Sequence, residues 1–123
     1  MTLRAAVVGM GGIGHRHAQV YKDHAQADVV AVCDIDKEKA DAAAAKFGAR
    51  AFYSVPEMIA SGTEIDVASV CTAGVENGSL HYEPTTQLLN ASIAVLGEKP
   101  ISNNIQEAKE MVALAKAKGL RYG

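Results

Sequence analysis

Short apolar runs alternate with longer segments of helical periodicity along the whole chain. The apolar runs predict five strands, at residues 3–8, 28–33, 50–53, 66–71 and 91–96. The helical patterns between and after them occupy residues 12–24, 37–47, 54–62, 81–90 and 102–118. This alternation is typical of an α/β fold, a doubly wound parallel sheet with helices on both faces.

Local signals set several of the predicted helix ends. Asp36 is the expected N-cap of the helix over residues 37–47, and Gly48 follows its last residue. Either Ser102 or Asn103 is the expected N-cap of the final helix. Residues 120–123 resemble the beginning of a sixth strand, so we expect a single domain over residues 1–123 that is truncated near this strand.

A glycine-rich motif directly follows the first predicted strand. In the pattern Gly9-x-Gly11-x-x-Gly14, the first glycine permits a tight turn and the second lets the backbone approach a pyrophosphate. The third lets the following helix pack closely on the strand. Gly12 and Ile13 lie at the start of this helix, whose free N–H groups and positive dipole end suit an anion. We therefore predict that all five residues contact a nicotinamide dinucleotide.

An acidic residue follows the second predicted strand at the spacing of a dinucleotide-binding motif. Asp34 lies twenty residues after Gly14, where its carboxylate accepts hydrogen bonds from the adenosine ribose hydroxyls. Because this carboxylate repels a 2′-phosphate, NAD is favoured over NADP, although Lys37 and Lys39 leave NADP open. Asp34 as a helix N-cap is the alternative interpretation, but Asp36 suits that position better.

The loop after the fourth predicted strand is expected on the other side of the same crevice. Ligands of doubly wound sheets bind beyond the carboxyl ends of the strands, where the strand order reverses. Thr72, Asn77 and His81 are therefore expected near the nicotinamide or the substrate, with a plain surface loop as the alternative for Asn77 and Ser79. The predicted cofactor contacts of this segment are Cys71, Thr72, Ala73 and His81.

Composition and charge exclude several other classes of protein. The 123 residues contain twelve Lys and Arg against fourteen Asp and Glu, spread along the chain, so a basic face for nucleic acid is not expected. There is no apolar run of membrane-spanning length and no secretory signal pattern, so we expect a cytoplasmic protein without membrane contact.

Cysteine and histidine do not indicate a metal site. Cys33 and Cys71 end two predicted strands without a C-x-x-C spacing, and are expected to be buried structural thiols. His15 and His17 lie two residues apart, which places them on different sides of a helix. His15 is near enough to the helix start to contact a phosphate, whereas His17 is expected to pack or cap locally.

Glu98-Lys99-Pro100 follows the fifth predicted strand. Taken alone it reads as an exposed turn, but its place at the carboxyl end of a strand favours a site. The chain also contains the glycine motif, His17, Asp34, Val70-Cys71-Thr72 and His81. Through this combination, essentially the whole chain resembles one protein family. This is the N-terminal Rossmann domain of the glucose-fructose oxidoreductase, inositol dehydrogenase and rhizopine-catabolism family of NAD(P)-dependent oxidoreductases.

The resemblance implies roles for two residues of this turn. It places Lys99 beside the nicotinamide and the substrate as the catalytic residue, and Glu98 on the nicotinamide ribose. A cation that fixes the substrate oxygen and helps to shift its proton lowers the barrier to hydride transfer. The family's activity is oxidation of a secondary alcohol of a sugar, cyclitol or similar polyol, which is the function that we predict for the whole protein.

The resemblance also implies a second, substrate-binding domain that is absent from these 123 residues, and a homo-oligomer at full length. The chain alone is then expected to bind NAD at best. One alternative is a non-catalytic NAD(H)-binding sensor or corepressor-like module, which has no need for Lys99. Another, an S-adenosylmethionine-dependent methyltransferase, leaves Glu98-Lys99-Pro100 unexplained. The loop over residues 72–79 is longer than in many family members, so roles between Ala73 and Asn77 transfer poorly.

Overall fold

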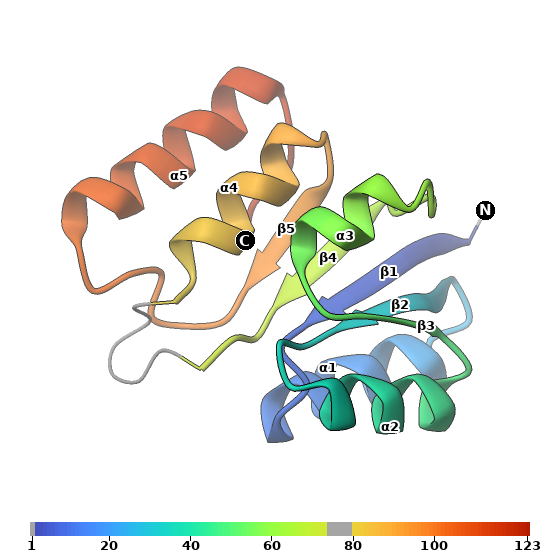
Figure 1. The fold of residues 1–123 in the computed structure, drawn as a ribbon. Coiled ribbons are helices and arrows are strands. Elements are labelled where there is room, and N and C mark those ends of the chain that lie inside the picture. Colours follow the sequence, from blue (N-terminus) through green and yellow to red (C-terminus); the bar gives the residue numbers. More distant parts are fainter. Residues whose placement is uncertain (1, 74–79) are drawn as a thin grey trace.

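The computed structural model describes residues 2–73 and 80–123, which form one sheet and the helices around it (Figure 1). The strands are β1 (Leu3–Val8), β2 (Ala27–Cys33), β3 (Arg50–Phe52), β4 (Val67–Val70) and β5 (Ala94–Gly97). The helices are α1 (Gly12–Asp23), α2 (Lys37–Phe47), α3 (Val55–Ala60), α4 (Tyr82–Asn90) and α5 (Ile105–Lys118). The elements alternate as the apolar pattern predicts.

The sheet is parallel and has the strand order β3-β2-β1-β4-β5. The order reverses between β1 and β4, so the loops after these two strands flank the switch point at which doubly wound sheets bind ligands. Helices α1 and α2 lie on one face of the sheet, and α3, α4 and α5 lie on the other (Figure 1). The predicted doubly wound α/β fold is therefore confirmed.

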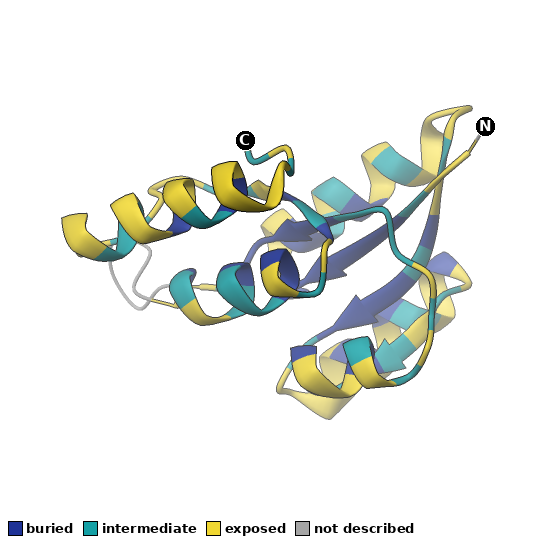
Figure 2. Cartoon of the chain, turned by 90° about the horizontal axis from the view of Figure 1, so that it is seen from above, coloured by how far each residue is buried: buried dark blue, intermediate teal, exposed yellow. Residues whose placement is uncertain are grey.

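Each face of the sheet has its own apolar layer. On the first face, Ala18 of α1 and Phe47 of α2 pack against strand residues such as Val7. On the second, Leu88 of α4 and Met58 of α3 pack in the other cluster. Figure 2 shows the strands buried between helices whose outer surfaces are exposed. Because residues of β1 alternate between the two layers, this strand is the centre of the core.

The helix caps confirm most of the local predictions. The carboxylate of Asp36 accepts hydrogen bonds from the backbone N–H groups of Glu38 and Lys39, and Gly48 ends α2 in the left-handed conformation at φ 66°. Capping by Asp36 leaves Asp34 free for another role. The N-cap of α5 was predicted wrongly, because Asn104 occupies it and accepts from Gln106 N and Glu107 N.

The predicted fifth strand also begins too early. Residues 91–93 are apolar enough for a strand, but Ala91 ends α4 and Ser92 turns the chain at φ 63°. The strand then covers Ala94–Gly97, three residues later than predicted at its start. Near the C-terminus, Tyr122 makes a single parallel bridge with Val95, at the position where the sequence predicts a sixth strand.

A bidentate ion pair fixes the amino ends of β1 and β4. Arg4 Nε and Nη2 each donate to Asp66 at 3.0 Å, and the Arg4 backbone N–H donates to the same carboxylate at 2.8 Å. These hydrogen bonds from Arg4, more than its charge, lower the pKa of Asp66 to about 2. The pair therefore favours the folded state whenever the carboxylate is ionised.

Stability is expected to fall in acid through this carboxylate. Its folded pKa lies below its unfolded pKa, so its stabilisation is complete above the unfolded value and is lost between roughly pH 5 and pH 2. Urea unfolding across this range should show Asp66→Asn less stable than the parent at pH 7, with the difference closing towards pH 2. The exposed Asp28→Asn is the control, and an equal difference at all pH values would contradict the prediction.

Candidate functional site

The glycine-rich loop between β1 and α1 is built by close backbone contacts. Gly9 has φ 92°, and a Cβ atom there would lie 2.7 Å from the backbone of Cys71 and Thr72. A Cβ atom on Gly14 would lie 1.8 Å from the carbonyl oxygen of Gly9. Gly9 thus lets the loops after β1 and β4 meet, and Gly14 lets α1 begin directly against the loop.

The middle of the loop is open instead. Among the described atoms, nothing lies within 4 Å of a Cβ built on Gly11 or on Gly12. Within the described part of the chain, no side chain caps α1, and its first turn has no acidic residue. The free N–H groups at the start of α1, around Ile13, are therefore available to an anion, and their contact with a diphosphate stays a prediction.

Asp34 connects the loop to the end of β2. Its Oδ2 accepts from the backbone N–H of Met10 at 2.8 Å, and its Oδ1 accepts from the backbone N–H of Asp36 at 2.8 Å. The side chain is therefore held next to the glycine-rich loop. Each carboxylate oxygen keeps a second lone pair for a ribose hydroxyl, so the geometry is compatible with the predicted cofactor contact.

Replacing Asp34 tests this contact. We expect Asp34→Ala to weaken NAD binding roughly tenfold or more, because hydrogen bonds to a charged group are lost. Discrimination against NADP should fall as well, since no carboxylate then repels the 2′-phosphate. Calorimetric titration with both cofactors measures the two effects, with Asp28→Ala as the control. Unchanged selectivity between NAD and NADP would show that Asp34 does not contact the adenosine ribose.

The loop after β4 lies next to the glycines. Cys71 donates its backbone N–H to Val8 O at 2.7 Å, and burial raises the pKa of its thiol to about 12, so the thiol stays protonated. Thr72 Oγ1 donates to Leu80 O at 3.0 Å. Ala73 is the last residue described before the gap. Asn77 and Ser79, for which a site or a surface loop was expected, lie outside the described residues.

His81 joins this loop to the turn after β5. The side chain is 4% exposed, and its ring nitrogens lie 2.9 Å from Thr72 O and 2.8 Å from Pro100 O. Both ring nitrogens therefore face backbone oxygens. In this structure His81 links two segments at the carboxyl edge of the sheet, and its predicted contact with the cofactor stays a prediction.

Glu98-Lys99-Pro100 leaves the carboxyl end of β5 beside the switch point. The Glu98 backbone N–H donates to Val70 O at 2.9 Å, which ties the turn to β4. The Lys99–Pro100 peptide bond is cis, and Lys99 is exposed. The hydrogen bond from His17 is the main cause that lowers the pKa of Glu98, so its carboxylate is ionised at neutral pH.

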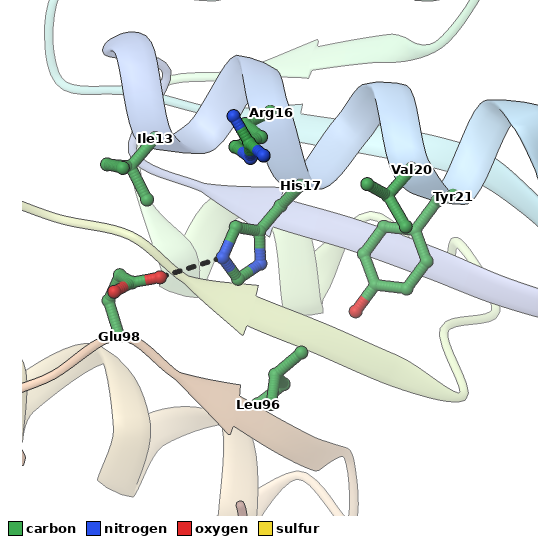
Figure 3. A pocket seen from close by; sticks show the side chains of 7 residues that line it. All are labelled: Ile13, Arg16, His17, Val20, Tyr21, Leu96 and Glu98. Carbon is green, nitrogen blue, oxygen red and sulfur yellow. Dashed lines mark hydrogen bonds and ion pairs between the residues drawn. The ribbon is translucent and has the colours of Figure 1, made fainter.

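A hollow of about 370 Å³ separates α1 from the end of β5 (Figure 3). It is lined by Ile13, Arg16, His17, Val20, Tyr21, Leu96 and Glu98. His17 crosses it, with Nδ1 2.9 Å from Ser69 Oγ and Nε2 2.9 Å from Glu98 Oε2. The expectation that His17 packs or caps locally was therefore wrong, because its partners lie on β4 and after β5.

Two signals in the sequence point to this contact in retrospect. Ser69 is a polar residue inside an otherwise apolar strand, and such a buried hydroxyl needs a hydrogen-bonding partner. His17 and Tyr21 lie four residues apart, on the same side of α1. Neither signal names Glu98, which is 81 residues away from His17.

The remaining candidates are placed as follows. His15 Nδ1 lies 3.0 Å from Gly11 O, and its ring packs at a tilt on Phe47. Cys33 and Cys71 are free and buried, as predicted. Across residues 2–73 and 80–123, no three His, Cys, Asp or Glu side chains gather as metal ligands would. No described helix has both the length and the apolar character needed to cross a membrane.

A glycine-rich loop at the switch point, a following helix that no described side chain caps, and an acid after β2 define a dinucleotide-binding Rossmann domain. The model of the family described as "Oxidoreductase family, NAD-binding Rossmann fold" matches residues 3–123. The chain belongs to this family. The predicted family and the prediction of NAD as cofactor are thereby confirmed.

Curated proteins similar to this chain include sugar and inositol dehydrogenases. The chain is 33% identical over 118 residues to D-glucoside 3-dehydrogenase of Escherichia coli, covering 95% of this chain and 32% of the relative. It is 32% identical over 122 residues to inositol 2-dehydrogenase 3 of Saccharopolyspora erythraea, covering 98% of this chain and 35% of the relative. This chain thus spans about a third of the length of the curated relatives that it matches.

A solved dehydrogenase structure has the same fold. The WlbA dehydrogenase from Bordetella pertussis, in complex with NADH and UDP-GlcNAcA, superposes with a TM-score of 0.90 at 30% identity. The match covers 98% of this chain and 36% of that chain. The matched region is therefore part of a longer dehydrogenase whose structure was solved in complex with NADH.

Proposed function

We propose that this chain is the cofactor-binding part of an NAD-dependent dehydrogenase that oxidises a secondary alcohol of a sugar, cyclitol or similar polyol. The observation that carries the proposal is the position of Lys99. It follows Glu98 at the carboxyl end of β5, in a turn whose Pro100 carbonyl is held by His81 beside the glycine-rich loop. Names of relatives such as D-glucoside 3-dehydrogenase and inositol 2-dehydrogenase support the substrate class.

Each group has a role in this proposal. The N–H groups around Gly11 and Gly12 bind the diphosphate, Asp34 binds the adenosine ribose and favours NAD over NADP, and Glu98 binds the nicotinamide ribose. Bound nicotinamide supplies the hydride acceptor. Lys99 fixes the substrate oxygen and helps to shift its proton. Further substrate contacts come from polypeptide outside these 123 residues.

Calorimetric titration with NAD, NADH and NADP tests the cofactor part of the proposal directly. We expect binding of NAD and NADH, and weaker binding of NADP. If none of the three binds to the folded chain, the proposed cofactor role is wrong for this chain. The substrate class is tested on the longest polypeptide that carries this domain, by following NADH formation with sugars, cyclitols and simple secondary alcohols. Turnover of simple alcohols alone would contradict the proposed class.

A further inference from the structure

A continuous line of hydrogen bonds runs from the middle of α1 to the end of β5. Tyr21 OH lies 2.8 Å from Ser69 Oγ, and the same oxygen meets His17 Nδ1. The other ring nitrogen of His17 meets the carboxylate of Glu98, as Figure 3 shows. The line therefore joins a fully buried serine to a carboxylate next to Lys99.

The chemistry of the partners sets the direction of the bond to Glu98. An ionised carboxylate only accepts, so His17 Nε2–H is the donor, both in the neutral ring protonated at Nε2 and in the imidazolium. On the other side, the Ser69 hydroxyl pairs with Nδ1 and with the Tyr21 hydroxyl. Because Ser69 is 0% exposed, its hydroxyl depends on these protein partners, and the bonds hold the ring in one orientation.

The position of His17 on α1 relates Glu98 to the glycine-rich loop. His17 lies four residues after Ile13, so both side chains are on the same side of the helix, and both line the hollow. Ile13 belongs to the first turn of α1, the turn whose N–H groups face the proposed diphosphate position. One rigid helix therefore presents N–H groups to the diphosphate and also holds Glu98.

The electrostatic surroundings keep the Glu98 carboxylate ionised, so that it accepts hydrogen bonds. The hydrogen bond from His17 lowers the pKa of Glu98 more than any other cause, against the opposing effect of burial. The Lys99 backbone N–H and the nearby charges of His17 and Lys99 lower it further. Glu98 thus stays ionised, with lone pairs left for the hydroxyl groups of a ribose.

We propose that His17 is a positioning residue that acts through Glu98, fixing this carboxylate at the distance from the glycine-rich loop that the nicotinamide ribose requires. The inference rests on the proposed function, in which Glu98 binds that ribose. In this proposal, α1 sets the distance between the site for the diphosphate and the site for the nicotinamide ribose of the cofactor. Removing the donor should then weaken the nicotinamide half of the binding and spare the adenosine half.

Three substitutions at His17 separate this role from simple packing. His17→Gln keeps an amide donor near the position of Nε2, within reach of Glu98. His17→Asn places its amide near the position of Nδ1, so it reaches Ser69 and not Glu98. His17→Leu keeps a similar volume and removes both polar contacts. Melting temperature is measured for each variant, so that affinity can be compared among folded chains.

The probes are NADH, which carries the nicotinamide ribose, and ADP, which does not. We expect the Asn and Leu variants to bind NADH about tenfold more weakly and ADP within about twofold of the parent. The Gln variant should bind NADH within about threefold of the parent. In a Glu98→Ala background, His17→Leu should add almost nothing, because two residues that act as a unit are not additive.

Several results would overturn the inference. Equal weakening of NADH and ADP binding would show that His17 only supports the fold. Parent-like NADH binding by His17→Leu, or full additivity with Glu98→Ala, would show that it does not act through Glu98. These outcomes require a parent chain that binds NADH, and a folded parent that binds none would overturn the proposed function itself.

Discussion

Gly11→Val is expected to abolish NAD binding while leaving the melting temperature of the chain unchanged. Gly11 has φ −82° and ψ −162°, an extended conformation that valine adopts readily. Among the described residues, apart from the chain neighbours of Gly11, no atom lies within 4 Å of a Cβ at this position, so the branch point of the new side chain meets no described part of the fold. The new side chain occupies the space proposed for the diphosphate, and we expect at least about a hundredfold loss of affinity.

Gly14→Ala is the matched comparison, because it places the new atom in a filled space. Its Cβ would lie 1.8 Å from Gly9 O, so α1 or the loop must move, at a cost of about 3 kcal/mol. Thermal unfolding and calorimetric titration of both variants should show stable folding without binding for Gly11→Val. They should show lowered stability for Gly14→Ala. Parent-like NAD binding by Gly11→Val would show that the diphosphate does not lie against Gly11.

Lys99→Met is expected to lower turnover about 10²- to 10⁴-fold, the usual contribution of a group that moves a proton in the transition state. Binding of NAD should change little, because Lys99 is proposed to act on the substrate and not on the diphosphate. The measurement is steady-state NADH formation by the longest polypeptide that carries this domain, together with calorimetric NAD affinity.

Two further variants make this result specific. Lys116→Met removes an exposed positive charge from α5 and should leave turnover unchanged. Lys99→Arg keeps the charge but changes its shape and proton affinity, so it should recover little of the lost rate. Parent-like turnover in Lys99→Met would contradict a catalytic role for Lys99.

The sequence predicts most of the fold because the relevant signals are local. The helix over residues 37–47 has the predicted ends, since the Asp36 side chain and the left-handed Gly48 act on their own neighbours. The order of strands and helices follows from apolar periodicity. Right-handed crossovers then arrange parallel strands on each side of the switch point.

The incorrect predictions of a strand start and a helix cap have local causes. Residues 91–93 have the composition of a strand, but the backbone needs these positions to end α4 and turn the chain. Ser102, Asn103 and Asn104 are three neighbouring residues that can each cap a helix, and composition does not rank them. The structure selects Asn104, while Ser102 Oγ donates to Glu107 and accepts from Asn104 N.

The candidate site also contains residues that the sequence predicts and contacts that it does not predict. Gly9, Gly11, Gly14 and Asp34 are predicted from spacing alone, because each is defined by its distance along the chain from β1 or β2. The cofactor contacts of these residues stay predictions, and the structure adds where their backbones and side chains lie. The role of His17 was missed because its hydrogen-bonding partners, Ser69 on β4 and Glu98 after β5, are distant in the sequence.

By itself, the sequence determined the succession of elements, the glycine-rich turn, the acid after β2 and the polar turn that contains Lys99. These features depend on neighbouring residues and on periodicity, which are local properties of the chain. Only the tertiary structure decided that His17 faces Glu98 and that His81 lies between Thr72 and Pro100. Such contacts exist only after the parallel strands bring distant segments to one edge of the sheet, so no local pattern specifies them.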